Sequence, residues 1–226
     1  MKVKKCAFTG HRPQSLPFGF NESDERCIAL KQTLRAEIIR LIEQEGVTHF
    51  ISGMALGVDM YAAEIVLGLK SSYEGITLES AIPCESQAEK WSEEQRDRYF
   101  DIASKCDKET LIQHHYTADC MHKRNRYMVD QADFIIAVWD GRPSGTGRTV
   151  QYAQRSQLSI RKRCLLTEKK SQTRLLVAFE AFSYSPTCMT PLEASIAFVP
   201  AELTAMHMTM TIIPSPIAIA IMGRTV

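Results

Sequence analysis

The chain has 226 residues, of which 45% are hydrophobic and 23% are charged, and its formal net charge is +1. These values are typical of a soluble globular protein with one domain of ordinary size, and they give no global electrostatic reason for nucleic-acid binding. The seven cysteines are scattered without the paired spacing of zinc sites, so we expect reduced thiols and no metal or other cofactor. The chain shows neither a signal peptide nor an apolar run of about 18 residues, and we expect a cytoplasmic protein without membrane contact.

The first part of the chain alternates short apolar runs with helical patterns. Residues 5–9 predict a strand, and the helix that follows begins near Asn21 or Ser23, either of which can cap it, and ends at Gly46. Apolar side chains recur in this helix every three or four residues, which predicts one buried face. They are Cys27, Leu30, Leu34, Ile38, Leu41 and Ile42. A strand over 47–52 and a helix over about 57–69 come next.

The same alternation continues further along. Residues 76–82 predict a strand and residues 87–105 a charged helix, followed by a weaker strand over 109–113 and a helix over 118–131. An apolar strand at 134–139 leads through a glycine-rich loop into a helix from about Thr149 to Gln157, and residues 163–166 can supply a last strand. Strands that alternate with helices, without hairpin signals, predict an α/β protein with a mostly parallel sheet and right-handed crossovers.

The composition changes near the end of the chain. Residues 171–226 hold five charged side chains and five of the ten methionines, with no clear helical or strand period. A second domain of this size would be marginally stable. We therefore expect a globular domain over 1–166 and an atypical tail over 167–226 that is loosely packed or disordered.

Polar or glycine-rich segments follow four of the expected strands. They are residues 9–13, 52–59, 83–85 and 140–149. In open α/β sheets, ligands bind outside the carboxyl ends of the strands, near the point where the strand order reverses. We therefore expect one rim of the sheet to collect these segments.

The connection from Val138 to Gln151 has the strand, loop and helix form of an anion site. Its glycines allow close approach of the backbone, and the free N–H groups and positive dipole end of the helix face a phosphate. It is not a Walker loop, because no Gly-Lys-Ser/Thr follows, and it is not a strict GxGxxG pattern. Taken alone, the segment is equally consistent with a plain turn.

Other positions supply side chains that suit a nucleotide. The guanidinium of Arg12 fits a phosphate bidentately, and Asp59 either accepts from sugar hydroxyls or caps a helix. Arg124 lies in a cationic helix start that, in isolation, is more often a solvated face. The candidate ligand-binding residues are Thr9, Gly10, His11, Arg12, Ser52, Gly53, Gly57, Asp59, Arg124, Asp140, Gly141, Gly145, Thr146, Gly147 and Thr149.

Three motifs in this order resemble the YpsA-like branch of the SLOG superfamily. They are Thr-Gly-His-Arg-Pro at 9–13, Ser-Gly-Met-Ala-Leu-Gly-Val-Asp at 52–59, and Trp-Asp-Gly at 139–141 with the segment 144–153. SLOG proteins are Rossmann-like nucleotide-binding domains related to the LOG phosphoribohydrolases and to the DNA-processing protein DprA. The resemblance covers about residues 1–166. It implies a Rossmann-like three-layer fold and a nucleotide or ADP-ribose-like ligand.

Two motifs of the LOG enzymes, which cleave the N-glycosidic bond of nucleoside monophosphates, are matched in part. The residues that match their helix motif are Met121, His122, Arg124 and Met128, with Asn125 in place of a lysine. In their glycine-rich loop motif, Gln151 stands where an acidic residue is expected. A carboxylate stabilises oxocarbenium character, and an amide cannot act as a general base. The resemblance therefore implies impaired hydrolysis but intact phosphate recognition.

The leading interpretation is a nucleotide-binding protein that acts as a ligand sensor or processor. Arg12 and Arg124 would contact phosphate, residues 145–149 would cradle it, and Ser52, Gly53 and Asp59 would hold ribose. One alternative is a LOG-like N-glycosidase with Arg124 as its candidate catalytic residue. Another is a DprA-like protein that binds single-stranded DNA, but the near-neutral charge and the lack of an aromatic-basic stripe argue against nucleic acid. The sequence leaves open whether the chain forms a homo-oligomer.

Overall fold

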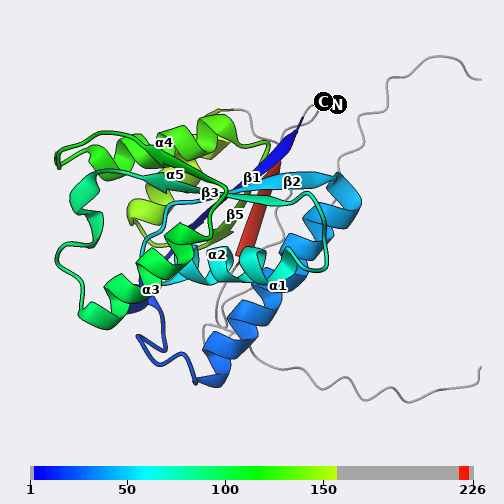
Figure 1. Cartoon of the computed structure of the whole chain (residues 1–226), viewed down its shortest axis with the longest axis horizontal. Helices are drawn as coiled ribbons and strands as arrows, with labels where there is room; N and C mark the ends of the chain where they lie inside the picture. Colours follow the sequence, from blue (N-terminus) through cyan, green and yellow to red (C-terminus); the bar gives the residue numbers. More distant parts are fainter. Residues whose placement is uncertain (1–2, 157–218, 224–226) are drawn as a thin grey trace, which may run out of the picture. The chain divides into compact units, whose positions relative to one another are not determined.

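A computed structural model describes residues 3–156 and 219–223, all of which belong to one compact unit. Its strands form one sheet with the order β4-β3-β2-β1-β5-β6 (Figure 1). Their bounds are Lys4–Gly10 (β1), Val47–Ser52 (β2), Thr77–Ile82 (β3), Lys108–Leu111 (β4), Phe134–Val138 (β5) and Ile219–Gly223 (β6). The pairings from β4 across to β5 are parallel, and β6 is antiparallel to β5. The predicted α/β class with a mostly parallel sheet is confirmed.

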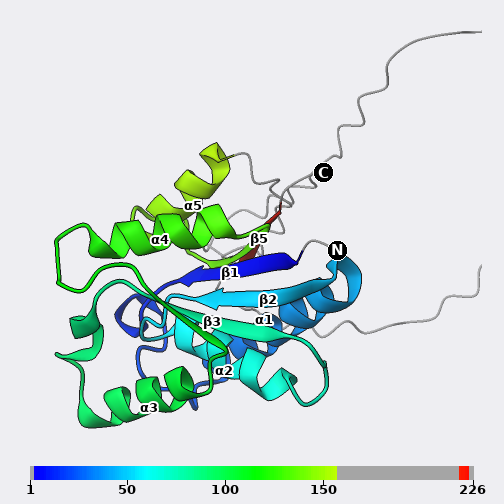
Figure 2. The same cartoon turned by 45° about the horizontal axis from the view of Figure 1, so that its top comes forward.

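Helices cover both faces of the sheet. Helices α1, α2 and α3 lie on one face, and α4 and α5 lie side by side on the other (Figure 2). Their bounds are Glu25–Glu45 (α1), Val58–Leu69 (α2), Glu93–Ser104 (α3), Cys120–Gln131 (α4) and Gly145–Arg155 (α5), with short 3-10 helices at Pro13–Ser15 (η1) and Glu85–Ala88 (η2). These three layers are the Rossmann-like arrangement that the resemblance implied.

The core follows the two-residue period of the strands. In β1, Cys6 and Phe8 pack with α1, α2 and α3, whereas Ala7 packs with α4 and α5. Successive side chains of a strand point to opposite faces, so this central strand is apolar on both sides. The rings of Phe8 and Phe50 stack on one face with their centroids 5.9 Å apart. Apolar side chains therefore cover β1 from both faces of the sheet.

Helix α1 begins at a different residue from the two that its sequence suggested. Asp24 is the N-cap, and its carboxylate accepts from the N–H of Arg26 at 2.9 Å. The Asn21 side chain instead accepts from the N–H of Ser23 in the preceding turn. The predicted end is confirmed, because Gly46 adopts a left-handed conformation with φ of 68°.

The predicted helix over 87–105 is wrong in its first part. Residues 85–88 form the 3-10 helix η2, and α3 begins only at Glu93. Ser92 and Gln95 make a reciprocal capping box, which fixes the start of α3 at this point. Gln87, expected inside the helix, is buried and donates to the carbonyl of Met54 at 2.7 Å.

Helix α5 also departs from expectation, because it begins at Gly145 rather than near Thr149. Ser144 is its N-cap and accepts from the N–H of Gly147 at 3.0 Å. The glycines at 145 and 147 therefore belong to the first turn of the helix and not to a loop. This places the positive end of the α5 dipole directly after β5.

The rest of the chain bears on two further expectations. The suggested strand at 163–166 and the domain boundary at 166 lie outside the described residues. Residues 219–223, which fall within the tail expected over 167–226, form β6 at the edge of the sheet. None of the helices within residues 3–156 is both long and apolar enough to span a bilayer.

Candidate functional site

The strand order reverses between β1 and β5, which lie side by side although β2, β3 and β4 separate them in sequence. The carboxyl ends of these two strands open into a cleft of about 440 Å³, which we call the main cleft. Its lining residues are Thr9, Gly10, His11, Arg12, Gln14, Ser15, Ala55, Asp59, Met121, His122, Arg124, Asn125, Ser144, Gly145 and Thr146. A crevice at this switch point is where open α/β sheets bind ligands.

Two contacts fix the walls of the main cleft where β1 and β5 end. His11 is buried, and its Nε2 lies 3.0 Å from Oδ1 of Asp140 and 3.2 Å from the backbone nitrogen of that residue. The hydroxyl of Thr146 donates to the carbonyl of Gly10 at 3.0 Å, which ties the start of α5 to β1. The imidazole and the helix end are therefore held in place before any ligand arrives.

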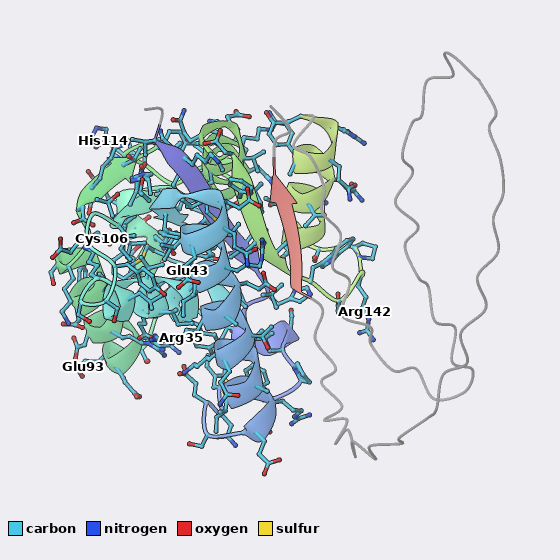
Figure 3. All side chains as sticks on the ribbon, turned by 90° about the vertical axis from the view of Figure 1, so that its right-hand side faces the viewer. Arg35, Glu43, Glu93, Cys106, His114 and Arg142 are labelled. Carbon is cyan, nitrogen blue, oxygen red and sulfur yellow. The ribbon has the colours of Figure 1, made fainter. Side chains whose placement is uncertain are left out.

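The electrostatics of Asp140 support this arrangement. Burial alone would raise its pKa, but hydrogen bonds from the N–H of Arg142 and from His11 outweigh that effect. The pKa of Asp140 is therefore held below its ordinary value, and the carboxylate is ionised at neutral pH. The exposed side chain of Arg142 projects from the β5–α5 connection (Figure 3).

Arg124 on α4 is the most unusual group in the main cleft. Its side chain is only 5% exposed, and its Nη1 lies 3.4 Å from Oδ2 of Asp59 on α2, whose side chain is 7% exposed. The Nε atom is buried without any hydrogen-bond partner. A guanidinium has five N–H donors, and burying them unpaired is unfavourable. This cation is therefore under-satisfied by the protein itself.

The charges around the pair reinforce that conclusion. Burial raises the pKa of Asp59 above its ordinary value, against the opposing effect of the Arg124 charge. Burial also lowers the pKa of Arg124, and the positive charge of Arg12 acts in the same direction. The main cleft is therefore lined by two arginines and one carboxylate, which leaves net positive charge for an anion.

The segment after β2 is shaped to admit the Arg124 side chain. A Cβ atom at Gly53 would lie 1.5 Å from Nη1 of Arg124, so no side chain fits there. Gly57 has φ of 90°, and a Cβ atom there would lie 2.8 Å from the carbonyl oxygen of His11. These two glycines let the β2–α2 connection pass close to α4 and to the end of β1.

Ser52 and Asp59 brace this connection from within. The Ser52 hydroxyl donates to the carbonyl of Asp59 at 2.8 Å and accepts from the N–H of Met54 at 3.1 Å. The N–H of Ala55 contributes to lowering the pKa of Asp59, against the larger effect of burial. Asp59 is not the N-cap of α2, a position that Gly57 occupies.

The main cleft unites eight of the fifteen residues suggested by the sequence, and it leaves seven outside its lining. The eight are Thr9, Gly10, His11, Arg12, Asp59, Arg124, Gly145 and Thr146. The seven are Ser52, Gly53, Gly57, Asp140, Gly141, Gly147 and Thr149. Two of them, Gly53 and Gly57, shape the segment after β2. Gly141 lies in the β5–α5 turn with φ of 86°.

Sequence reasoning missed several residues of the main cleft. Gln14 and Ser15 line it from η1, and Ala55 lines it from the β2–α2 connection. Pro13, which favours the first turn of a helix, was the available signal for η1. No sequence signal marked Gln87, whose amide reaches the carbonyls of Gly53 and Met54 from η2.

The fold and the main cleft define a Rossmann-like α/β protein with a cationic crevice at its switch point. The family model described as the YspA SLOG family matches residues 6–170, and the chain belongs to this family. Membership supports a nucleotide-related function at a coarse level and suggests that the protein binds a ligand.

Individual relatives agree with this assignment. The chain is 32% identical over 146 residues to a UPF0398 protein of Brevibacillus brevis, a match that covers 64% of this chain and 77% of the relative. It is 32% identical over 143 residues to the uncharacterized SPbeta prophage-derived protein YoqJ of Bacillus subtilis, covering 58% and 84% respectively. A UPF0398 protein of Halalkalibacterium halodurans is 27% identical over 158 residues, covering 69% and 82%.

Proposed function

We propose that this protein binds a nucleotide or a nucleotide-derived molecule in the main cleft, through a phosphate group. The observation that carries the proposal is Arg124, a buried guanidinium with an unpartnered Nε and a single carboxylate at 3.4 Å. A phosphate would supply the acceptors that Arg124 lacks, in the bidentate geometry that guanidinium favours.

The first turn of α5 adds a second source of anion affinity. Ser144 satisfies the N–H of Gly147, while the N–H groups of Gly145 and Thr146 make no hydrogen bond with the described residues. Together with the helix dipole, such N–H groups bind phosphate. Arg12 also lines the cleft and is exposed, so its guanidinium is accessible to a phosphate.

The position of the carboxylates supports binding rather than hydrolysis as the proposed function. Gln151, which stands where the LOG enzymes have an acidic residue, does not line the main cleft. Asp59 is the one carboxylate among the lining residues, and it is paired with Arg124. The lining of the main cleft thus offers no second carboxylate to share the chemistry of N-glycosidic cleavage.

Thermal unfolding of the full chain with AMP, ADP, NAD and ADP-ribose tests the proposal. A ligand at about 100 times its Kd adds ~2.7 kcal/mol to stability, which corresponds to a midpoint increase of roughly 5–10 °C. We expect such an increase with at least one of these ligands, and its loss in Arg124→Met.

The control for this experiment is Lys123→Gln, which removes the neighbouring positive charge from the exposed side of α4. This variant should retain the full increase. Absence of any increase with all four ligands would overturn the proposal. Release of free base from AMP would show instead that the protein is an N-glycosidase.

A further inference from the structure

Helices α4 and α5 form a second cleft, of about 340 Å³, which we call the arginine cleft. Its lining residues are His122, Asn125, Arg126, Arg148, Thr149, Gln151, Tyr152 and Arg155. None of them belongs to the β1 or β2 ends that build the main cleft. None of its three arginines is among the candidate ligand-binding residues suggested by the sequence, although Arg148 falls within the segment 145–149 that was expected to cradle phosphate.

Helical periodicity explains why these side chains converge. Arg148, Tyr152 and Arg155 lie at positions i, i+4 and i+7 of α5, so they share one face of that helix. On α4, His122 and Arg126 are likewise four residues apart. The two faces meet where Arg126 lies 5.5 Å from the centre of the Tyr152 ring and Nη1 of Arg148 lies 3.2 Å from Nε2 of His122.

The arginine cleft concentrates positive charge that the chain as a whole does not have. The chain carries 27 basic and 26 acidic side chains, yet three of the eight lining residues are arginines and none is acidic. Like charges gathered on two packed helices repel one another and oppose folding. A guanidinium has donors only, so Arg148 donates to Nε2 of His122 in this arrangement.

The two clefts share part of their lining on α4. His122 and Asn125 line both of them. The Asn125 amide donates to the hydroxyl of Thr149 at 2.8 Å, which joins the two helices at the boundary between the clefts. The shared lining places the two clefts next to each other, so a single ligand can contact residues of both.

We propose that the arginine cleft is a second phosphate subsite, and that the ligand is a nucleotide carrying two separate phosphate groups, one for each cleft. This inference rests on the proposed nucleotide binding and adds the class of nucleotide. Guanidinium groups without a lining carboxylate suit a doubly charged phosphate, and the Tyr152 ring supplies a flat surface between them. The main cleft binds the first phosphate, and the arginine cleft selects for the second.

Isothermal titration of the full chain tests this selection with AMP and with adenosine 3′,5′- and 2′,5′-bisphosphate. We expect at least one bisphosphate to bind about tenfold more tightly than AMP, the equivalent of ~1.4 kcal/mol. Arg126→Gln and Arg155→Gln should each remove most of this gain and leave the affinity for AMP unchanged. Both residues are exposed, so neither change affects the core.

A matched control is Arg35→Gln on the exposed side of α1 (Figure 3), which removes one positive charge far in sequence from both clefts and should leave the gain intact. Binding of AMP without any gain from a second phosphate would overturn this inference and leave the proposed function standing. Failure of all three ligands to bind would overturn this inference, and the thermal unfolding experiment with ADP, NAD and ADP-ribose then decides whether the proposed function fails with it. Competition by a short single-stranded oligonucleotide at lower concentration than any bisphosphate would identify a nucleic-acid site instead.

Discussion

The guanidinium of Arg124 on α4 meets the carboxylate of Asp59 on α2, with 3.4 Å between Nη1 and Oδ2, and so joins helices from opposite faces of the sheet. The contact is made over the carboxyl ends of the strands, where Gly53 leaves room for it. A buried ion pair of this length, with Nε unpartnered, is weak evidence for stability. Its position at the switch point makes it a candidate for ligand recognition.

Gly53→Ala tests the path of the Arg124 side chain. The new Cβ would lie 1.5 Å from Nη1 and 2.4 Å from Cζ of Arg124, so the guanidinium must move. We expect a loss of roughly 1–3 kcal/mol in the free energy of unfolding, measured with urea, together with weaker nucleotide binding. Gly68→Ala on α2 meets nothing within 4 Å and should not destabilise the protein. Equal stability of both variants would contradict the close approach.

Asp59→Asn separates two roles for this carboxylate. If Asp59 serves as the internal partner of Arg124, the asparagine removes the negative charge that competes with a ligand for the guanidinium. The affinity for phosphate should then rise by roughly three- to tenfold. Calorimetric titration with AMP at neutral pH measures this change. A fall in affinity would show instead that Asp59 accepts from the sugar hydroxyls. Asp101→Asn, on the exposed side of α3, is the control for the change in charge.

Glu79 gives a prediction for pH dependence. Its buried carboxylate accepts from Tyr127 at 2.6 Å and Thr110 at 2.7 Å, and it contacts His49 Nε2 at 2.8 Å and Lys108 Nζ at 3.1 Å. Burial alone would raise its pKa, but these partners outweigh that effect and lower the pKa well below 4.5. The unfolded chain then binds more protons, so the stability from Glu79 is fully present above that value and is lost as the pH falls.

We therefore expect Glu79→Gln to lower the free energy of unfolding at pH 7 by about 1–3 kcal/mol, because buried partners are left unsatisfied. Between about pH 5 and pH 3, the variant should lose less stability than the wild type. Urea unfolding at each pH measures both effects. Glu74→Gln, at an exposed turn, should follow the wild type throughout. Parallel pH profiles for the Glu79 variant and the wild type would rule out a lowered pKa.

Ser144→Ala tests the cap of α5. The hydroxyl that accepts from the N–H of Gly147 is lost, and removal of such a cap destabilises a protein by about 1 kcal/mol. We expect this decrease in urea unfolding, whereas Ser72→Ala in the exposed turn after α2 should change stability by less than about 0.5 kcal/mol. An unchanged midpoint in Ser144→Ala would place the start of α5 further along the chain.

Local pattern accounts for most of the element assignments. The spacing from Cys27 to Leu41 gave the buried face of α1, and the bounds of β2 at Val47–Ser52 match the expectation. The predicted helix starts are wrong where two local signals compete for the first residue of the helix. Ser92 starts α3 because its capping box is more favourable than a helix continued from Gln87, and Ser144 starts α5 because a capped first turn tolerates glycine.

By itself, the sequence determined the α/β class and the set of polar segments that follow the strands, because both depend on short-range periodicity and on the chemistry of glycine. Tertiary structure alone decided which of those segments meet. Arg124 and Asp59 are separated by 65 residues, and only the crossovers around β1 bring them together. The same holds for β6, whose pairing with β5 depends on a partner some 80 residues away along the chain. Contacts of this kind leave no periodic trace in the sequence, since their geometry is fixed by the packing of whole elements.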